Sequence, residues 1–529
     1  MAAGNRLFTL YEFNRTQCSL AHGWPEHIGL HLQNDPFGMC PREIMAIELS
    51  CNLADTATPL HHPWRNCVGS CHAPVTLRAD WQAQLKQAKA DLDFRYVRFH
   101  GILSDDMGTL ICQDEKSLYS FFNTDQIFDF LRTIDMRPVV ELSFMPATLA
   151  SGGNTVFRYR GNITPPKDYA QWGELIRKLV AHWVDRYGIE EVAQWYFEVW
   201  NEPNLDAFWT GGQEGYFKLY QTTADAIKSV DQRLRVGGPA TAGNAWLEDF
   251  LSFCKGTDLP VDFVSTHYYP TDAFGQIGSD TVTQLEHASL DVMRTRALTA
   301  KHLTGDMPLL YTEWNITSNP RDPMHDHAMA AALAVRICME VDDLVTAYSY
   351  WTFTDIFEEN YFPSMPFHGG FGLLNLHGIA KPVYRAFEMM NSLGDQQFPV
   401  QQAVQNVAVW IAEEKADVTK TNILCINQAM PLRPIATEIV QLHLTGRPGK
   451  QVRKVTISRI DEENCNPELH WERMGQPEYL SHAQVEQLKA ASVPMEKILP
   501  FAASANTVAI DVELPPQSLA LLRVEWEVA

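Results

Sequence analysis

The run of residues 195–204, WYFEVWNEPN, constrains the fold of this chain more than any other segment. It is rich in apolar and aromatic residues on both faces, as expected of a parallel strand that is covered on both sides. Pro203 cannot continue such a strand, so Glu202 is predicted to lie at the strand's C-terminal end. In a parallel barrel, that end carries the groups that do chemistry.

A second segment ends in the same way. Residues 308–315, PLLYTEWN, are mostly apolar until Glu313, which lies 313 − 202 = 111 positions after Glu202. Two carboxylates at the ends of two strands are what the cleavage of a glycosidic bond requires. Either glutamate alone could be a solvated loop residue, but the pair in matching contexts favours a catalytic function.

Patterns typical of strands and helices alternate from Trp64 to about Leu393, which predicts a (β/α)8 barrel. Amphipathic segments such as 79–92 and 170–187 are predicted to be helices between the strands. The predicted barrel strands lie near residues 66–70, 95–100, 137–143, 195–201, 234–238, 262–268, 308–313 and 346–352.

After Pro399 the pattern changes to short alternating strands, which is typical of a β-sandwich. These strands are predicted near residues 406–412, 421–427, 436–444, 453–459, 507–513 and 518–526. We therefore predict an α/β fold in which a TIM barrel over residues 63–395 is followed by an accessory C-terminal β-sandwich over residues 396–529.

Composition argues against several classes of function. The formal charge, 42 − 64 = −22, repels nucleic acid and anionic lipid but does not affect a neutral sugar. No run of 18 apolar residues predicts a membrane span. The first residues contain no basic region followed by a long apolar core, so we expect a cytoplasmic protein.

The cysteines and histidines do not indicate a metal site. Cys67 and Cys71 have neither redox nor zinc-knuckle spacing, so free buried thiols in a reducing compartment are expected. His325 and His327 could suggest a pair of metal ligands, but no third ligand is near. Asp326 is better interpreted as the cap of the Ala-rich helix that follows, and we expect no metal and no organic cofactor.

Side chains on shared strand faces can be assigned to a predicted pocket. Arg98 and His100 share one face of the second strand, as do His267 and Tyr269 in the sixth. The histidines can hydrogen-bond sugar hydroxyls, and Arg98 can keep a nucleophilic carboxylate ionised by charge pairing. Trp351 closes the eighth strand and offers a flat indole to a pyranose, although core packing is an equally good interpretation.

Taken together, the motifs make the chain resemble glycoside hydrolase family 39, the family of β-xylosidases and α-L-iduronidases. The resemblance begins near Trp64 and runs to the C-terminus. The motifs are RFHG at 98–101, GNITPPKDY at 161–169, FEVWNEPNL at 197–205, GGPA at 237–240, VDFVSTHYYP at 261–270, TEWN at 312–315, YWTFTDIFEE at 350–359 and PFHGGFGLLN at 366–375. NEP alone is shared by many retaining barrel glycosidases of clan A, whereas the ordered set is specific to this family.

The resemblance implies roles for individual residues. Family members contact the sugar through the positions that match His100, Asn201 and His267. The amide of Asn201 is expected to reach the 2-hydroxyl of the sugar. In the xylosidase branch, the glutamates that match Glu358 and Glu359 hold sugar hydroxyls, and such a pair would repel the carboxylate of a uronic acid. This favours a neutral pentose.

The resemblance also concerns the segment before the barrel. Family members have a strand there that pairs into the sandwich, and residues 44–53 are the candidate here. Residues 45–62 are therefore assigned to this strand and a linker. Residues 1–44 match nothing in the family and are assigned to an N-terminal extension.

These observations predict a retaining glycoside hydrolase with Glu313 as nucleophile and Glu202 as proton donor and base. The expected activity is that of an exo-acting β-xylosidase, which releases xylose from the non-reducing end of short β-1,4-xylooligosaccharides. One alternative is another family 39 glycosidase: α-L-iduronidase-like, β-glucosidase, β-galactosidase or arabinosidase. A second is a non-catalytic carbohydrate-binding barrel, which the presence of both carboxylates argues against.

Overall fold

The computed structural model describes residues 46–113, 116–271, 280–359, 362–401, 406–504 and 507–528. The chain divides into two units, Met1–Ile44 and Met45–Ala529. The extension predicted over residues 1–44 therefore lies outside the described residues. Everything below concerns the second unit.

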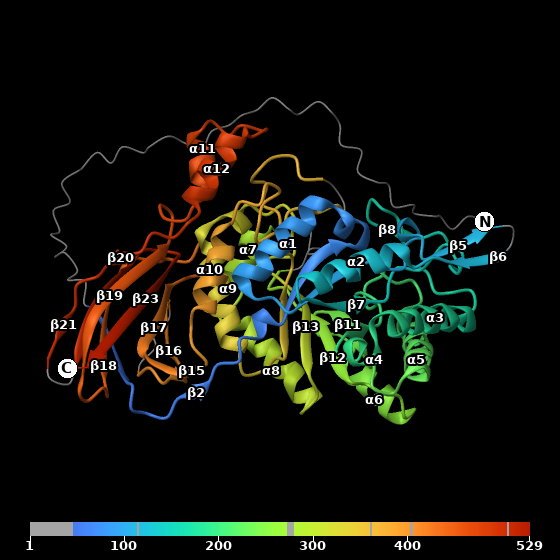
Figure 1. The fold of residues 1–529 in the computed structure, drawn as a ribbon, viewed down its shortest axis with the longest axis horizontal. Coiled ribbons are helices and arrows are strands. Elements are labelled where there is room, and N and C mark those ends of the chain that lie inside the picture. The colour runs from blue at the N-terminus through green and yellow to red at the C-terminus, as the bar shows by residue number, and fades with distance from the viewer. Residues whose placement is uncertain are drawn as a thin grey trace, which may run out of the picture. The chain divides into compact units, whose positions relative to one another are not determined.

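Eight parallel strands close into a barrel in the order β10–β11–β12–β13–β14–β3–β4–β7 (Figure 1). The strands are β3 (Cys67–His72), β4 (Tyr96–His100), β7 (Arg137–Glu141), β10 (Tyr196–Glu198), β11 (Arg235–Ala242), β12 (Phe263–His267), β13 (Leu309–Trp314) and β14 (Ala347–Tyr350). Each corresponds to a strand predicted from the sequence. The largest differences are in β11, which continues to Ala242 rather than ending near residue 238, and in β10, which ends at Glu198 rather than near residue 201. The backbone after β10 turns through positive φ at Trp200 (73°) and Glu202 (43°), which ends that strand early.

Helices alternate with these strands, as the amphipathic segments predict. They are α1 (Ala79–Leu92), α2 (Phe122–Thr133), α3 (Tyr169–Tyr187), α4 (Ile189–Val192), α5 (Gly212–Val230), α6 (Leu247–Gly256), α7 (Thr281–His287), α8 (Val292–Thr304), α9 (Ala328–Val341) and α10 (Pro382–Asn391). Single 3-10 turns are η1 (Pro63–Arg65), η2 (Ala73–Leu77), η3 (Asp105–Met107) and η4 (Pro323–Asp326). Two hairpins lie in the loops after β4 and β7: β5 (Leu110–Gln113) with β6 (Lys116–Tyr119), and β8 (Thr155–Val156) with β9 (Gly161–Asn162).

The interior of the barrel changes from apolar to ionic along the strands. An apolar layer lies toward their N-terminal ends and consists of Cys67, Val139, Phe263, Leu310 and Ala347. Because side chains alternate between the faces of a strand, Glu141 and Thr312, each two positions after a member of this layer, also point inward. Arg98 and Glu198 are fully buried in β4 and β10. The ionic groups thus lie above an apolar floor.

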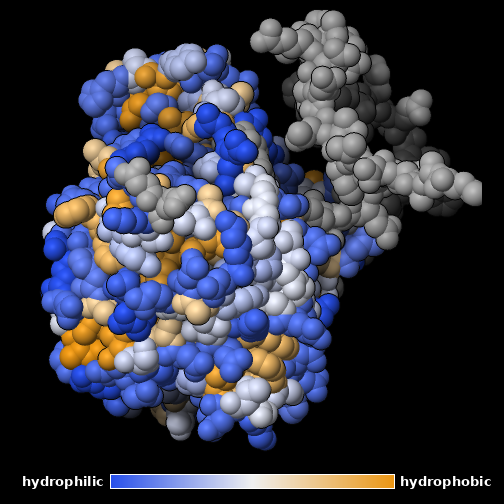
Figure 2. Space-filling view, turned by 90° about the vertical axis from the view of Figure 1, so that its right-hand side faces the viewer, coloured by the Kyte–Doolittle hydropathy of each residue, from blue (hydrophilic) through white to orange (hydrophobic). Residues whose placement is uncertain are grey.

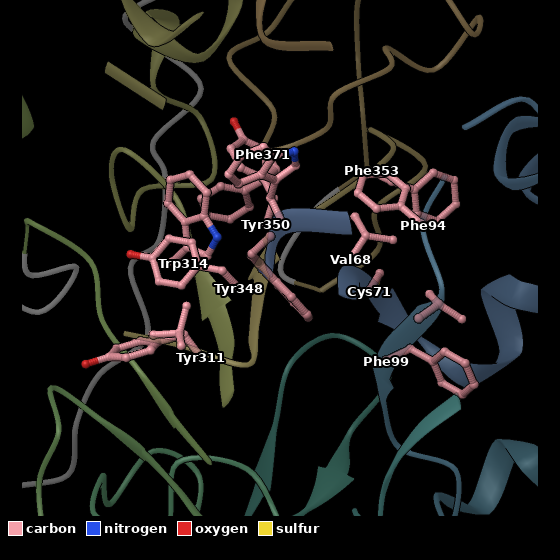
Figure 3. Packing of buried hydrophobic residues seen from close by; sticks show 14 of the residues in the cluster. Val68, Cys71, Phe94, Phe99, Tyr311, Trp314, Tyr348, Tyr350, Phe353 and Phe371 are labelled. Carbon is pink, nitrogen blue, oxygen red and sulfur yellow. The ribbon is translucent and has the colours of Figure 1, made fainter. Parts of the chain in front are cut away.

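Large aromatic side chains pack on the opposite faces of β13 and β14. Figure 3 shows Tyr311, Trp314, Tyr348 and Tyr350 close together. The rings of Trp314 and Tyr348 are stacked with centroids 4.6 Å apart, and Tyr311 lies 5.4 Å from Tyr348. This packing holds β13, which carries Glu313, firmly against β14.

Two sheets form the C-terminal part of the fold, with an apolar core that includes residues of both (Figure 1). One sheet contains β1 (Ile47–Asn52), β18 (Glu438–Thr445), β22 (Val508–Leu514) and β21 (Ala502–Ala503). The other contains β2 (Thr58–Pro59), β15 (Gln396–Phe398), β16 (Val407–Glu414), β17 (Asp417–Asn427), β23 (Ser518–Val528), β19 (Lys450–Ile460) and β20 (Lys497–Ile498). β1 precedes the barrel in the chain and pairs in parallel with β18, as the family resemblance implies.

A helical insertion between β19 and β20 was not expected from the sequence. It contains α11 (Pro467–Arg473) and α12 (His482–Ala491). Trp471 and Leu488 of the insertion pack with Phe367 and Ile379 from the loop after β14. The Ser481–Gln484 capping box at the start of α12 was the sequence signal for this helix.

Hydrophilic residues predominate on the face of the molecule in Figure 2, where apolar residues form separate patches. Among the described residues, no helix combines the length and apolar character needed to span a membrane.

Candidate active site

A buried guanidinium joins three carboxylates at the C-terminal ends of the barrel strands. Arg98 lies 2.5 Å from Glu198, 2.7 Å from Glu313 and 2.8 Å from Glu141, measured between nitrogen and oxygen atoms. We refer to these four residues as the Arg98 cluster. Burial opposes the charge on Arg98, but the three carboxylates raise its pKa well above the ordinary value. The predicted pairing of Arg98 with Glu313 is therefore present in the structure.

Glu141, Glu198 and Thr312 belong to the site, although the sequence analysis assigned no role to them. Each points inward by the same strand alternation that places Arg98. A carboxylate at an inward position of a barrel strand is costly unless it is paired. Acidic residues at inward positions of the predicted strands were therefore the sequence signal that a cation lies within the barrel.

The two predicted catalytic carboxylates lie close together. One oxygen of Glu202, one oxygen of Glu313 and a ring nitrogen of His267 all lie within 4.8 Å of one another. A retaining glycosidase has carboxyl groups about 5–5.5 Å apart, whereas an inverting one needs about 6.5–9.5 Å to admit a water molecule. The observed closeness fits the retaining arrangement.

The loop after β10 positions Glu202. Its backbone N–H donates to the carbonyl of Ala240 at 2.8 Å. Glu202 is only 8% exposed, and among the described residues no ion pair joins its carboxyl group to Arg98. Burial raises the pKa of Glu202 to about 7, although the charges of His100 and Arg98 act in the opposite direction. Glu202 is thus largely protonated in weakly acidic solution.

A chain of hydrogen bonds also places a proton on Glu202. The Thr312 hydroxyl donates to Glu198 at 2.7 Å, so it can only accept from His267 Nε2, 3.1 Å away. Burial lowers the pKa of His267 to about 4, so its ring is neutral and its Nδ1 is an acceptor. Glu202 Oε1 lies 2.9 Å from that Nδ1 and must supply the proton between them. His267 therefore contacts the acid, whereas the resemblance implied a contact with the sugar.

Glu313 has a different environment. Besides the guanidinium of Arg98, its other oxygen accepts a hydrogen bond from the Tyr269 hydroxyl at 3.0 Å. A cation on one oxygen and a hydroxyl donor on the other fix the orientation of this carboxylate. Tyr269, which was predicted to bind substrate, contacts Glu313 and lies just beyond the end of β12.

His100 bridges the cluster and the loop after β14. Its Nδ1 lies 2.7 Å from Glu141, and its Nε2 lies 3.7 Å from Glu313 and 3.6 Å from Glu359. Burial lowers the pKa of His100, but Glu141 and the other carboxylates overcome this and raise it to about 9. Burial raises the pKa of Glu359 to about 8.

Trp351 and Asn201 lie beside these groups. The ring of Trp351 is 4.8 Å from that of His100, and Gly69 allows the indole to approach because a Cβ there would lie 2.5 Å from Trp351 Cε3. Asn201 Oδ1 accepts from Arg98 at 2.9 Å. The Nδ2 group of Asn201 is therefore directed away from Arg98 and is available as a donor.

Glu358 lies apart from the other predicted residues. Its carboxylate pairs with Arg78 at 2.7 Å and its side chain is 23% exposed. It lines a pocket of about 380 Å³ together with His72, Pro74, Val75, Arg78, Asp106, Arg158 and Tyr159. Neighbouring residues in an extended segment face opposite sides, so only one of the two adjacent glutamates can join His100. The structure places Glu359, and not Glu358, in that position.

One group among the described residues has the spacing of metal ligands, and it consists of Glu202, His267 and Glu313. The contacts already present account for its geometry. His267 Nδ1 is bonded to Glu202, and the charge of Glu313 is balanced by Arg98. The arrangement thus fits acid–base chemistry without a metal ligand role.

His325 and His327 do not converge on a common point. His325 is buried with Nδ1 near the Gly369 carbonyl (2.9 Å) and Nε2 near the Thr317 hydroxyl (3.0 Å), whereas the half-exposed His327 lies 3.3 Å from Glu468. The prediction that Asp326 caps the following helix is wrong. The N-cap of α9 is His327, and Asp326 is instead drawn into a buried ion pair with Lys381 at 2.6 Å.

Comparison with known proteins identifies the relatives of this chain. The family described as "Glycosyl hydrolases family 39" matches residues 46–507. The β-xylosidase of Caldicellulosiruptor saccharolyticus is 45% identical over 92% of this chain and 99% of its own length. The β-xylosidase of Geobacillus stearothermophilus is 38% identical over 87% of this chain and 92% of its own length. The structure of a family 39 β-xylosidase from Caulobacter crescentus superposes with a TM-score of 0.76 at 34% identity, covering 91% of this chain and 100% of that one.

Proposed function

The chain belongs to glycosyl hydrolase family 39, and from that premise we propose that it is a retaining, exo-acting β-xylosidase. Its substrates would be short β-1,4-xylooligosaccharides, from which xylose is released at the non-reducing end. The observation that carries this proposal is the unequal environment of two adjacent carboxylates. Glu202 is buried beside a neutral histidine, whereas Glu313 is paired with Arg98.

In the first step, Glu313 attacks the anomeric carbon and forms a glycosyl-enzyme ester. Arg98 and Tyr269 hold its oxygens, so the carboxylate is oriented before the substrate arrives. Glu202 transfers its proton to the leaving oxygen as the bond breaks. A pKa of about 7 supplies this proton near neutral pH.

In the second step, the deprotonated Glu202 takes a proton from water, which attacks the ester from the face that the leaving group vacated. The sugar is released with its original anomeric configuration. Asn201 strengthens its hydrogen bond to the 2-hydroxyl as positive charge develops on the ring. Trp351 covers the apolar face of the sugar.

The charges within the site support a neutral sugar. The Arg98 cluster contains one guanidinium and three carboxylates, and among the described residues His100 is the only other cationic group paired with it. The carboxylate of a uronic acid would add an unpaired anion to a buried site that already has surplus acidic groups. Repulsion by a Glu358–Glu359 pair does not contribute to this selectivity, because Glu358 is paired with Arg78.

The proposal is tested with nitrophenyl glycosides of xylose, arabinose, glucose, galactose and iduronic acid, measured as kcat/KM. We expect β-xyloside to be the best substrate, with β-xylose as the first product detected by NMR. Loss of one contact to a sugar changes the preference between two substrates by only about 1–3 kcal/mol. Glucose carries an exocyclic carbon on C5 that xylose lacks, so strong rejection of the glucoside would indicate that the protein closes the site near C5. Equal turnover of glucoside and xyloside would contradict the xylosidase assignment.

We also propose that the protein acts in the cytoplasm. The eight cysteines among the described residues are free thiols, and all of these except Cys112 are buried. Burial raises the pKa of thiols such as Cys67 and Cys425 to about 12, so they remain unreactive. Fractionation of the native host, with activity found outside the cell, would contradict this location.

A further inference from the structure

Two buried polar atoms without a hydrogen-bond partner belong to the two loops that contact His100. They are the hydroxyl oxygen of Tyr159 and Oε1 of Glu359. His100 Nε2 lies 3.6 Å from the same Glu359 oxygen. Buried polar groups are normally satisfied, so neighbouring orphan groups at the edge of an active site indicate where a ligand supplies the missing partner.

The β8–β9 hairpin brings Tyr159 to this position. Its loop turns through positive φ at Phe157 (61°) and Arg160 (59°), a backbone conformation that bulky residues rarely adopt. The N–H of Arg158 donates to the backbone carbonyl of Glu359 at 2.6 Å, so the hairpin is attached to the loop that carries Glu359. Tyr159 follows Arg158 directly.

Aromatic contacts fix the orientation of the Tyr159 ring. It stacks on His72 with centroids 3.9 Å apart and an interplanar angle of 4°, and it lies 5.4 Å from the ring of Phe157. Phe157 in turn stacks on His100 at 6.0 Å. The hydroxyl therefore has little freedom to find another partner.

The hydroxyl is also in the electrostatic range of Glu359. Burial raises the pKa of Tyr159 well above its ordinary value, and the next largest contribution is the charge of Glu359. Tyr159 is thus a neutral phenol with a proton to donate throughout the working range of the enzyme.

The position of the anomeric carbon orients the sugar. That carbon must lie between Glu202 and Glu313. His100 Nε2 is 3.7 Å from Glu313 and 3.6 Å from Glu359, so Glu359 and the attached hairpin border the site on the side of His100. In a xylopyranose, the hydroxyl most remote from the anomeric carbon is the one at C4.

We propose that Tyr159 is a further substrate-binding residue, which donates a hydrogen bond to the 4-hydroxyl of the terminal xylose beside Glu359 and His100. This rests on the proposed xylosidase function. Tyr159, with the backbone of Arg158, then closes the pocket at the non-reducing end. A sugar attached at O4 would have to displace this hydrogen bond, which accounts for removal of one terminal residue at a time.

The experiment compares Tyr159→Phe with the wild type on nitrophenyl β-xyloside and on its 4-deoxy and 3-deoxy analogues. On the parent xyloside we expect kcat/KM to fall about tenfold to hundredfold, the range for an unpaired buried polar group. On the 4-deoxy analogue, the variant and the wild type should have equal kcat/KM, because the contact is absent in both. On the 3-deoxy analogue, the loss caused by the mutation should persist.

Tyr348→Phe is the matched control. The hydroxyl of Tyr348 is also buried without a partner, but its ring packs with Tyr311 and Trp314 on the outer face of the barrel. We expect its activity to equal that of the wild type on every substrate. A similar loss in this control would mean that removal of any buried hydroxyl disturbs the enzyme, and the assignment of Tyr159 would fail.

Each remaining outcome decides the proposal. Equal losses for Tyr159→Phe on the parent and 4-deoxy substrates would show that the residue supports the loop and does not contact O4. A loss that disappears only with the 3-deoxy analogue would move the contact to C3 and overturn the assignment. No loss on the parent xyloside would remove the contact altogether. If the proposed xylosidase function itself is wrong, the wild-type enzyme will not turn over the xyloside, and this result is distinct from any effect of the Tyr159 variant.

Discussion

Two buried ion clusters lie in the barrel, and they differ in what surrounds them. The Arg98 cluster adjoins Glu202 and Glu359, acids whose pKa values are raised by burial to about 7 and about 8. The second, which we call the Lys381 cluster, joins Lys381 to Asp326 at 2.6 Å and to Asp355 at 2.7 Å, with all three side chains at most 1% exposed. Both clusters pair one basic residue with more than one acid.

In the Lys381 cluster each aspartate has one oxygen in an ion pair with Lys381 and the other in a hydrogen bond to the backbone. The Lys381 ammonium also donates to the Gly370 carbonyl at 2.8 Å. The remaining oxygen of each aspartate accepts a backbone N–H at 2.7 Å, from Gly369 for Asp326 and from Gly372 for Asp355. These bonds anchor the loop that carries Glu359, and they leave nothing to bind a substrate.

The difference shows how a buried charge can be used. A saturated cluster stabilises a loop, because removing one partner leaves an uncompensated charge. A cluster beside groups that change protonation near neutral pH can take part in proton transfer. Mutations should therefore affect stability in one cluster and chemistry in the other.

The largest effect is expected for Glu313→Ala. Without the nucleophile no covalent intermediate can form, and kcat on nitrophenyl β-xyloside should fall by at least about 10⁴-fold. The unfolding temperature should change little, because Arg98 keeps two carboxylate partners. Azide should restore some turnover and give α-xylosyl azide, identified by NMR. Recovery of the β-anomer would show that Glu313 is not the nucleophile.

Glu202→Ala should give the next largest loss. Substrates with poor leaving groups should lose about 10²–10⁴-fold in kcat, because proton donation is missing. Aryl xylosides with good leaving groups should form the intermediate and then stall for lack of a base, which appears as a burst in rapid-mixing experiments. Added azide should release β-xylosyl azide. A uniform loss across all leaving groups would argue against the acid–base assignment.

Lys381→Met tests whether the Lys381 cluster contributes to stability. It leaves two buried aspartates without their cation, and breaking such a cluster costs about 3–5 kcal/mol of unfolding free energy. Urea denaturation measures this loss. The control is the triple variant Lys381→Met, Asp326→Asn, Asp355→Asn, which removes the charges together and should recover part of the stability. A single variant as stable as the wild type would mean that the Lys381 cluster does not anchor the loop.

The pH dependence of kcat/KM should show that the group beside the Arg98 cluster, Glu202, takes part in proton transfer. Glu202 acts as acid only while protonated, and burial raises its pKa to about 7. Above that pH the protonated fraction falls, so kcat/KM for unactivated xylosides should drop about tenfold per pH unit. Activated aryl xylosides, which need no acid, serve as the control and should show a weaker decline. A rate that stays level to pH 9 for both substrates would contradict the role of Glu202.

The smallest effect is expected for Glu358→Gln. Its carboxylate pairs with the half-exposed Arg78, and such surface pairs contribute no more than about 1 kcal/mol. We expect kcat/KM for xyloside to change less than about fivefold. The matched variant Glu359→Gln, at the neighbouring position beside His100, should lose at least about tenfold, as when a buried polar contact is lost. Equal losses in both variants would place Glu358 in the sugar site after all.

Local patterns were sufficient to predict much of the barrel. The eight strands, and the positions of Glu202 and Glu313 at or beyond strand ends, follow from short apolar runs and the residues that interrupt them. Strand alternation also placed Arg98 beside Glu313. The same reasoning was less successful where the backbone leaves regular structure. It extended β10 to residue 201, and it made Asp326 a helix cap.

The sequence by itself determined the barrel, the accessory sheets and the pair of carboxylates, because periodicity and turn residues act over a few positions along the chain. Only the tertiary structure decided which groups these residues meet. Thr312 reaches Glu198 across 114 positions, and Glu358 meets Arg78 across 280. Closure of the barrel and docking of its loops set these contacts, and no local pattern encodes them. For that reason the hydrogen bond between His267 and Glu202 and the unpaired hydroxyl of Tyr159 emerged only from the folded molecule.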